Sequence, residues 1–141
     1  MSRLSLAQSR ILIDAALQSA RQNGFKPMGV VVLDAAAQVV ASAREDGASA
    51  LRLDIAQGKA GAAVGMGTNS RALAARAKDM PAFFGTIATA SRQHFIPQTG
   101  AVLITDANGM VLGAAGASGG TGDEDEQIVI AGIAAAGLTH V

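Results

Sequence analysis

The chain has 141 residues, a length that suits one domain around a single hydrophobic core, so we expect residues 1–141 to form one domain. Half of the residues are hydrophobic, which excludes a disordered chain, and no stretch approaches the ~18 apolar residues of a membrane span. There is no cysteine, which excludes disulfides, thiolate chemistry and cysteine-ligated zinc. The first residues lack the apolar segment of a signal peptide, and we therefore expect a cytoplasmic protein.

The net charge is zero, but all 11 basic residues lie at or before Arg92. They are scattered singly and few aromatic side chains accompany them, so nucleic acid is not an expected partner. The hydrophobic content consists largely of small residues, with 31 Ala and 17 Gly but no Trp or Tyr. Small side chains bury little area each, and burial between subunits would compensate. The composition therefore predicts a homo-oligomer.

The N-terminal part predicts a helix followed by a β-hairpin. The helix begins at Ser5, because Ser5 and Gln8 have capping-box spacing, and Gly24 suits its end. The apolar, β-branched run Met28–Leu33 predicts a strand buried on both faces, and Val39–Arg44 predicts the returning strand. The turn between them carries Ala where Gly or Asn would adopt the backbone more easily.

The middle of the chain predicts three helices. The first runs from about 49 to 67 with Ser49 as its cap, the second covers 70–78, and Pro81 opens a short third one before a loop at 92–99. Glycines at 58, 61 and 65 weaken the first of these helices by about 1 kcal/mol each against Ala. We therefore expect another segment to pack closely against it.

The C-terminal part predicts a second hairpin and a last helix. Strands are expected at 100–106 and 110–117, joined through Asn108-Gly109, the strongest short-range hairpin signal. A glycine-rich loop at 118–122 leads into a helix over about 123–137. The loop is placed where a helix N-terminus could hold phosphate, but four carboxylates at 123–126 would repel it.

Those four carboxylates, Asp123 to Glu126, are interpreted first as capping residues. Thr121 with Glu124, and Asp123 with Glu126, both have capping-box spacing, and acids complement the helix dipole. The alternative is a metal or catalytic site, which no neighbouring His supports. The identity of any metal ligands is unknown from the sequence.

A few charged residues outside this turn are candidates for chemistry. Arg44 and Asp46 follow a predicted strand, where Asp46 either holds Arg44 and the turn or offers a carboxylate to a ligand. Lys59 either reaches solvent from its helix or serves as a buried cation for a carboxylate or propionate. His94 lies in a loop before a strand, whereas His140 is next to last and is expected to fray.

The order of several motifs resembles the GlcG/HbpS-like family, also called the haem-degrading domain family, which includes the C-terminal domain of PduO. The resemblance covers residues 5–138 and rests on Arg44-x-Asp46-Gly47-Ala48, Asp54-Ile55-Ala56, Lys59-Ala60, Gly109, Gly113, Gly116-Ala117-Ser118-Gly119 and Asp125-Glu126. The chain departs from the family pattern at Gly100–Leu103, where the family has Gly-Gly-x-Pro, and at Ala37, where it has Gly.

The resemblance implies a profilin-like α+β fold, with a five-stranded antiparallel sheet packed by helices, and assembly into dimers or larger even-numbered oligomers. Some members bind haem, and others accompany catabolic operons. For this chain it implies a haem or tetrapyrrole cofactor, with Arg44, Lys59 and His94 as candidate cofactor-binding residues. His94 and Met80 are the candidate iron ligands.

Three functions remain open at this point. The first is a haem- or tetrapyrrole-binding module. The second is a catabolic enzyme that performs acid–base chemistry on a small carboxylate, with the candidate catalytic residues Arg44, Asp46, Lys59, His94 and Glu126. The third is an accessory oligomer without catalysis. For the first two we expect Arg44, Asp46 and Lys59 to converge on one pocket, within one chain or with a neighbouring subunit supplying one of them.

Overall fold

The computed structural model describes residues 3–92 and 94–141. Its helices and strands, in chain order, are α1 (Leu6–Gln22), β1 (Gly29–Asp34), β2 (Val39–Arg44), α2 (Arg52–Met66), α3 (Ser70–Asp79), α4 (Pro81–Ala90), β3 (Ala101–Thr105), β4 (Val111–Ser118), α5 (Gly122–Ala135) and β5 (Thr139–His140). The strands form one five-stranded antiparallel sheet in the order β2-β1-β4-β3-β5. The predicted α+β fold with a five-stranded antiparallel sheet is confirmed.

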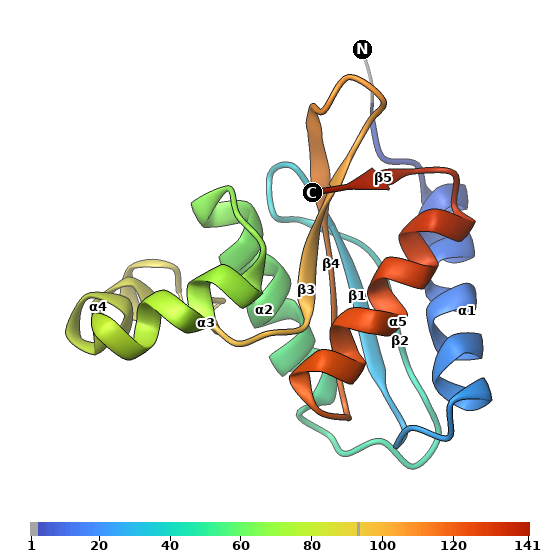
Figure 1. Ribbon diagram of the computed structural model, residues 1–141, viewed down its shortest axis with the longest axis horizontal. Helices are drawn as coiled ribbons and strands as arrows, with labels where there is room; N and C mark the ends of the chain where they lie inside the picture. Colours follow the sequence, from blue (N-terminus) through green and yellow to red (C-terminus); the bar gives the residue numbers. More distant parts are fainter. Residues whose placement is uncertain (1–2, 93) are drawn as a thin grey trace.

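The sheet lies between two helical layers (Figure 1). Helices α1 and α5 cover one face, and α2 covers the other, with α3 and α4 extending away from the sheet beyond α2. In β1, Val30 and Val32 pack into the core under α1 and α5, whereas Val31 and Leu33 pack against α2. An uninterrupted apolar run is what a strand covered on both faces requires, so the prediction for β1 is confirmed.

Both β-hairpins turn around an aspartate. Asp34 accepts hydrogen bonds from two backbone N–H groups of the first turn, and Asp106 does the same in the second. Ala37 has a left-handed backbone, with φ of 62°, at a place where glycine is the easier residue. The second turn places Gly109 in that region, with φ of 81°.

The predicted helix starts are confirmed for α1 and wrong for α2. Ser5 and Gln8 form a reciprocal capping box at the start of α1. Helix α2 instead begins at Arg52 and has no side-chain cap, because Ser49 contributes only its carbonyl oxygen, which accepts from the N–H of Arg52.

The glycines of α2 allow the segment before β3 to approach closely, as expected. A Cβ atom at Gly58 would lie 2.6 Å from the side chain of Ile96, and one at Gly61 would lie 2.5 Å from the carbonyl oxygen of His94. Gly65 has nothing within 4 Å, so the expectation fails there. The close approach holds segment 94–96 against α2, next to the site described below.

The outer edge of β3 is paired partly by side chains. Ser70 Oγ accepts from the N–H of Ala101 at 2.8 Å, and Asn69 Oδ1 accepts from the N–H of Leu103 at 2.8 Å. The two-residue strand β5 pairs with Ile104 and Thr105 of β3. The residue pattern did not predict this strand, although the family resemblance implied a fifth one. His140 therefore lies in a strand, and the prediction that it frays is wrong.

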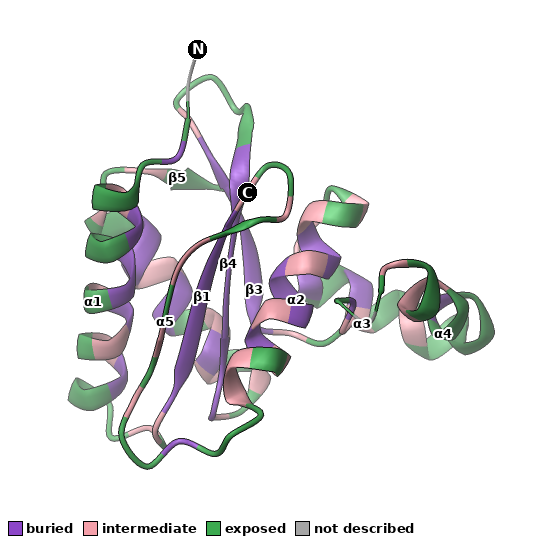
Figure 2. Cartoon of the chain, turned by 180° about the vertical axis from the view of Figure 1, so that it is seen from behind, coloured by how far each residue is buried: buried purple, intermediate pink, exposed green. Residues whose placement is uncertain are grey.

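Helices α3 and α4 form an arm that projects from the sheet (Figure 1). A small cluster of buried residues, Ala62, Leu73, Phe84 and Phe95, joins the arm to α2. Helix α4 carries no charged residue, yet Phe84 is its one buried residue and Phe83 is 45% exposed. Figure 2 shows this helix mostly in the colours of exposed and intermediate residues. No helix in the described part of the chain is long and apolar enough to cross a membrane.

Candidate functional site

A cleft of about 440 Å³ lies between the first turns of α2 and α5. Residues of the glycine-rich loop after β4 also line it. We call it the α5 cleft, and the lining residues that matter below are Arg52, Lys59, Ser118, Gly122, Asp123 and Asp125. The cleft therefore brings together three segments that are distant in sequence, namely the first half of α2, residues 98–99 and residues 118–125.

A buried ion pair between Lys59 and Asp125 forms one wall of the α5 cleft. Lys59 Nζ donates to Asp125 Oδ2 at 2.8 Å and to the carbonyl oxygen of Ala117 at 3.1 Å. The two side chains are only 7% and 2% exposed. Gly120 N–H donates to the other carboxylate oxygen of Asp125 at 2.9 Å. Lys59 therefore does not reach solvent, and the carboxylate that it binds is Asp125 of its own chain.

Burial is the main influence on the carboxyl of Asp125. Loss of solvent raises the pKa of Asp125, and the hydrogen bond and charge of Lys59, together with the Gly120 N–H, only partly counteract it. Asp125 therefore holds a proton more readily than an exposed carboxylate.

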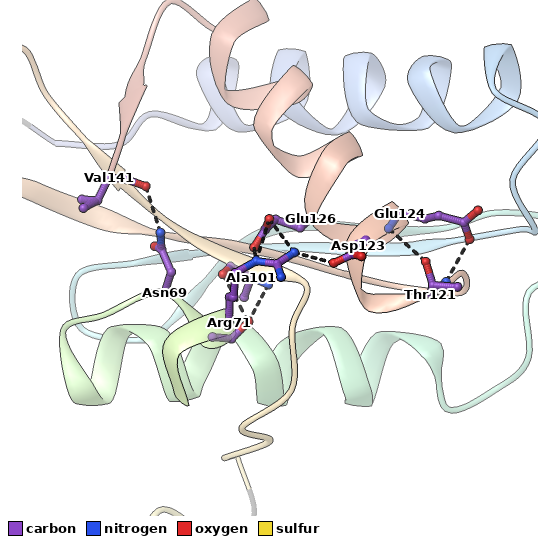
Figure 3. Close-up of polar contacts among 9 residues, drawn as sticks. Asn69, Arg71, Ala101, Thr121, Asp123, Glu124, Glu126 and Val141 are labelled. Carbon is purple, nitrogen blue, oxygen red and sulfur yellow. Dashed lines mark hydrogen bonds and ion pairs between the residues drawn. The ribbon is translucent and has the colours of Figure 1, made fainter. Parts of the chain in front are cut away.

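The remaining acids of the turn have separate roles. Thr121 and Glu124 form the predicted capping box, which is confirmed. Asp123 and Glu126 do not form the second one. Both bind Arg71 from α3 instead, Glu126 through both of its oxygens, and these bonds raise the pKa of Arg71 (Figure 3). Our expectation that the whole turn acts mainly through capping is wrong, because tertiary partners hold Asp123, Asp125 and Glu126.

Arg44 and Asp46 line a different cleft. It measures about 450 Å³ and includes Arg21 and Glu45, which form an ion pair at 3.0 Å. Both Arg44 and Asp46 are exposed, and Arg44 donates to the carbonyl oxygen of Ala48 at 2.6 Å. Within one chain these residues do not converge with Lys59, and only a neighbouring subunit could bring them together.

The two candidate iron ligands lie on the surface. His94 is exposed in the loop before β3, and Met80 is 45% exposed between α3 and α4. Neither lines the α5 cleft or the cleft beside Arg44. Among the described residues, no group of three His, Cys, Asp or Glu side chains could hold a metal ion.

A third cavity, of about 470 Å³, lies between α1 and β2, and we call it the α1–β2 groove. Its walls are mainly apolar, from Leu6, Ile13, Val40, Ala41 and Ala43. Arg10, Asp14 and Ser42 also line it, and Arg10 has no ion-pair partner in the described part of the chain. The sequence analysis did not single out this groove, because its two walls are residues of ordinary amphipathic elements.

The family model for haem-degrading HbpS-like proteins matches residues 4–134 of this fold. The chain belongs to the HbpS-like family. Its structure resembles that of PduOC in complex with haem, with a TM-score of 0.86 and 25% identity over 98% of each chain. It also resembles an HbpS double mutant from Streptomyces reticuli, with a TM-score of 0.81 and 27% identity over 95% of this chain and 87% of that one.

A third similar structure is ORFY from Klebsiella pneumoniae, with a TM-score of 0.85 and 21% identity over 97% of this chain and 93% of that one, which supports the fold alone. No curated protein sequence matches the chain. The family match and the haem complex of PduOC support haem-related binding at the level of the family.

Haem fits the α1–β2 groove only in part. The apolar walls suit a macrocycle, and Arg10 suits a propionate. However, none of the residues lining the groove is a His, Met, Cys or Tyr, the usual protein ligands of haem iron. The groove of a single chain therefore fits the porphyrin and its carboxylates, and it does not fit the iron.

Proposed function

We propose that this HbpS-like protein binds haem or a related tetrapyrrole in the α1–β2 groove. The observation that carries the proposal is the combination of apolar walls with Arg10, a cation that forms no ion pair among the described residues, although Asp14 lines the same groove. The volume of the groove lies within the ~300–1,000 Å³ usual for small-ligand sites. Arg10 would hold a propionate, and Leu6 and Val40 would contact the macrocycle. Bound haem would supply a redox-active iron.

The experiment compares haem with metal-free protoporphyrin IX in absorbance titrations. Because the groove offers no iron ligand, we expect the two affinities to agree within about threefold, which is under 1 kcal/mol. Leu6→Ser should weaken binding of both. Ile11→Ser is the matched control, because Ile11 is about as exposed on the same helix, at 49% against 46%, and does not line the groove. Equal affinities of Leu6→Ser and wild type would refute the groove.

The cofactor-binding residues predicted from the sequence remain a separate prediction. Arg44, Lys59 and His94 all lie outside the groove, so any contact that they make with a haem held there would come from a neighbouring copy of the chain. If His94 of a neighbouring copy ligates the iron, His94→Ala shifts the haem absorbance band at about 400 nm and leaves protoporphyrin binding unchanged.

We also propose that the chain assembles as a homo-oligomer, a dimer or a larger even-numbered assembly. Helix α4 supports this, because a helix without charged residues is normally buried, whereas seven of the ten residues of α4 are exposed. Light scattering should give a mass above that of one chain at micromolar concentration, and Phe83→Glu should reduce it. A monomeric wild type would refute the assembly.

Of the residues predicted for an acid–base enzyme, only Lys59 lines the α5 cleft. Arg44, Asp46, His94 and Glu126 lie outside it.

The cytoplasmic location remains a prediction, which fractionation of the host cell tests.

A further inference from the structure

We propose that the α5 cleft is a second binding site, separate from the α1–β2 groove, for a small ligand that carries an oxyanion, a carboxylate or a phosphate. The cleft is rich in hydrogen-bond donors that the protein leaves unused, and its carboxylates are already occupied. Each of these points follows from the contacts of a few residues.

Lys59 has a spare donor in the cleft. Its ammonium group carries three N–H bonds, and the structure gives it two acceptors, Ala117 O and Asp125 Oδ2. The third N–H bond of Lys59 has no acceptor among the residues described. Since the side chain is only 7% exposed, water has limited access to this proton, and a ligand oxygen in the cleft would satisfy it.

Arg52 is the second donor, and it makes one side-chain hydrogen bond where Lys59 makes two. One guanidinium nitrogen donates to Ser118 Oγ at 3.1 Å, which orients the group over the cleft, and no carboxylate in the described part of the chain pairs with it. The guanidinium has five N–H donors in a planar fork, a shape that matches the two oxygens of a carboxylate or phosphate.

The start of α5 adds backbone donors. The hydroxyl of Thr121 accepts a hydrogen bond from the N–H of Glu124, and the carbonyl oxygen of Thr121 accepts one from the N–H of Asp125. Within the described structure, the N–H groups of Gly122 and Asp123 have no acceptor. They lie at the positive end of the helix dipole, beside Arg52 and Lys59 in the same cleft.

The two carboxylates lining the cleft are already paired. Asp125 is bound by Lys59 and by the N–H of Gly120, and Asp123 is bound by Arg71 from outside the cleft. Arg52 forms no ion pair with either carboxylate, although its charge helps to lower the pKa of Asp125. An anionic ligand would accept hydrogen bonds from the unused N–H groups of Arg52 and Lys59, whereas a cation would face both side chains.

The test is a titration of the full-length protein followed by amide chemical shifts in NMR. The probes are malonate, benzoate and inorganic phosphate, with sodium chloride at matched ionic strength as the salt control. We expect saturable shifts at the amides of Gly120, Gly122 and Asp123. Saturation by malonate or benzoate identifies a carboxylate site, and saturation by phosphate alone identifies a phosphate site.

Variants decide whether Arg52 holds the anion. Arg52→Gln should weaken binding at least about tenfold, the loss expected for hydrogen bonds to a charged group, and Arg52→Lys should fall between this variant and wild type. Lys78→Gln is the control, because Lys78 is an exposed cation of α3 that does not line the cleft. Protoporphyrin binding should be unchanged in Arg52→Gln, so failure of this proposal and failure of the groove are distinguishable.

Several results would overturn the proposal. These are shifts with every probe that match those of sodium chloride, shifts that do not saturate, or equal affinities of Arg52→Gln and wild type. If Arg52→Gln does not fold, Arg52→Lys carries the test, and an affinity of that variant equal to wild type would reject a role for the guanidinium fork.

Discussion

Replacing Lys59 by Met should destabilise the protein, by an amount that depends on pH. Both members of the Lys59–Asp125 pair are nearly inaccessible, so Lys59→Met leaves a buried carboxylate without its counter-charge. Breaking a buried pair in this way costs about 3–5 kcal/mol at neutral pH. That is a large share of the ~5–15 kcal/mol that stabilises an ordinary domain.

The pH dependence follows from the carboxyl that remains. Burial already raises the pKa of Asp125, and loss of Lys59 removes the principal influence that lowers it. The folded state then binds the proton more tightly than the unfolded state. Protonation of Asp125 therefore stabilises the variant fully below about pH 4, the pKa of an aspartate in the unfolded chain. This stabilisation is lost as the pH rises through the higher pKa of Asp125 in the folded state.

Urea denaturation followed by circular dichroism measures this directly. Lys59→Met should recover part of its lost stability between about pH 7 and pH 4, relative to wild type. The double variant Lys59→Met/Asp125→Leu should be close to wild type or more stable at pH 7, because two apolar side chains need no desolvated charge. Asp14→Asn, at an exposed carboxylate of α1, is the control. A pH-independent loss, or a double variant as unstable as the sum of the single ones, would refute the reasoning.

The other predictions concern caps and close packing. Thr121→Ala removes the side-chain cap of α5 and should lower the unfolding free energy by about 0.5–2 kcal/mol in urea, whereas Thr89→Ala, on the exposed side of α4, should change it by less than about 0.5. Gly116→Ala places a Cβ atom 2.5 Å from a backbone oxygen of α2 and should cost about 1–3 kcal/mol; a stability equal to wild type would contradict this packing. Gly85→Ala meets nothing within 4 Å and should stabilise α4 by about 0.4–1 kcal/mol, measured by thermal unfolding.

The elements that the sequence predicts well are those whose signals are local. The apolar run of β1 and the capping boxes of Ser5 and Thr121 depend on residues within one turn or one strand, and all three are confirmed. Ser49 shows the limit of such signals, because the backbone turns through 49–51 before α2 begins, leaving its side chain without a helix N–H to cap. Strand β5 has only two residues, too few for any periodic pattern.

The candidate site was harder to predict, because its partners are distant in sequence. Lys59 and Asp125 are 66 positions apart, and neither sequence neighbourhood contains the other. A signal for Asp125 was nevertheless present. Asp125 falls on the same helical face as Ile128, Val129 and Ile133, all fully buried, which places its carboxyl toward the core. Reading that face would have assigned Asp125 a tertiary partner in place of a capping role.

The side-chain pairing along the edge of β3 makes two amides reporters of the arm. The amides of Ala101 and Leu103 donate to Ser70 and Asn69, which begin α3, whereas the amides of β1 are enclosed between two neighbouring strands. In native-state hydrogen exchange, the first pair should therefore exchange whenever α3 detaches, and the amides of β1 only when the whole domain unfolds. Detachment would also leave the outer edge of β3 without partners at Ala101 and Leu103, giving the sheet a second exposed edge at which another chain could add.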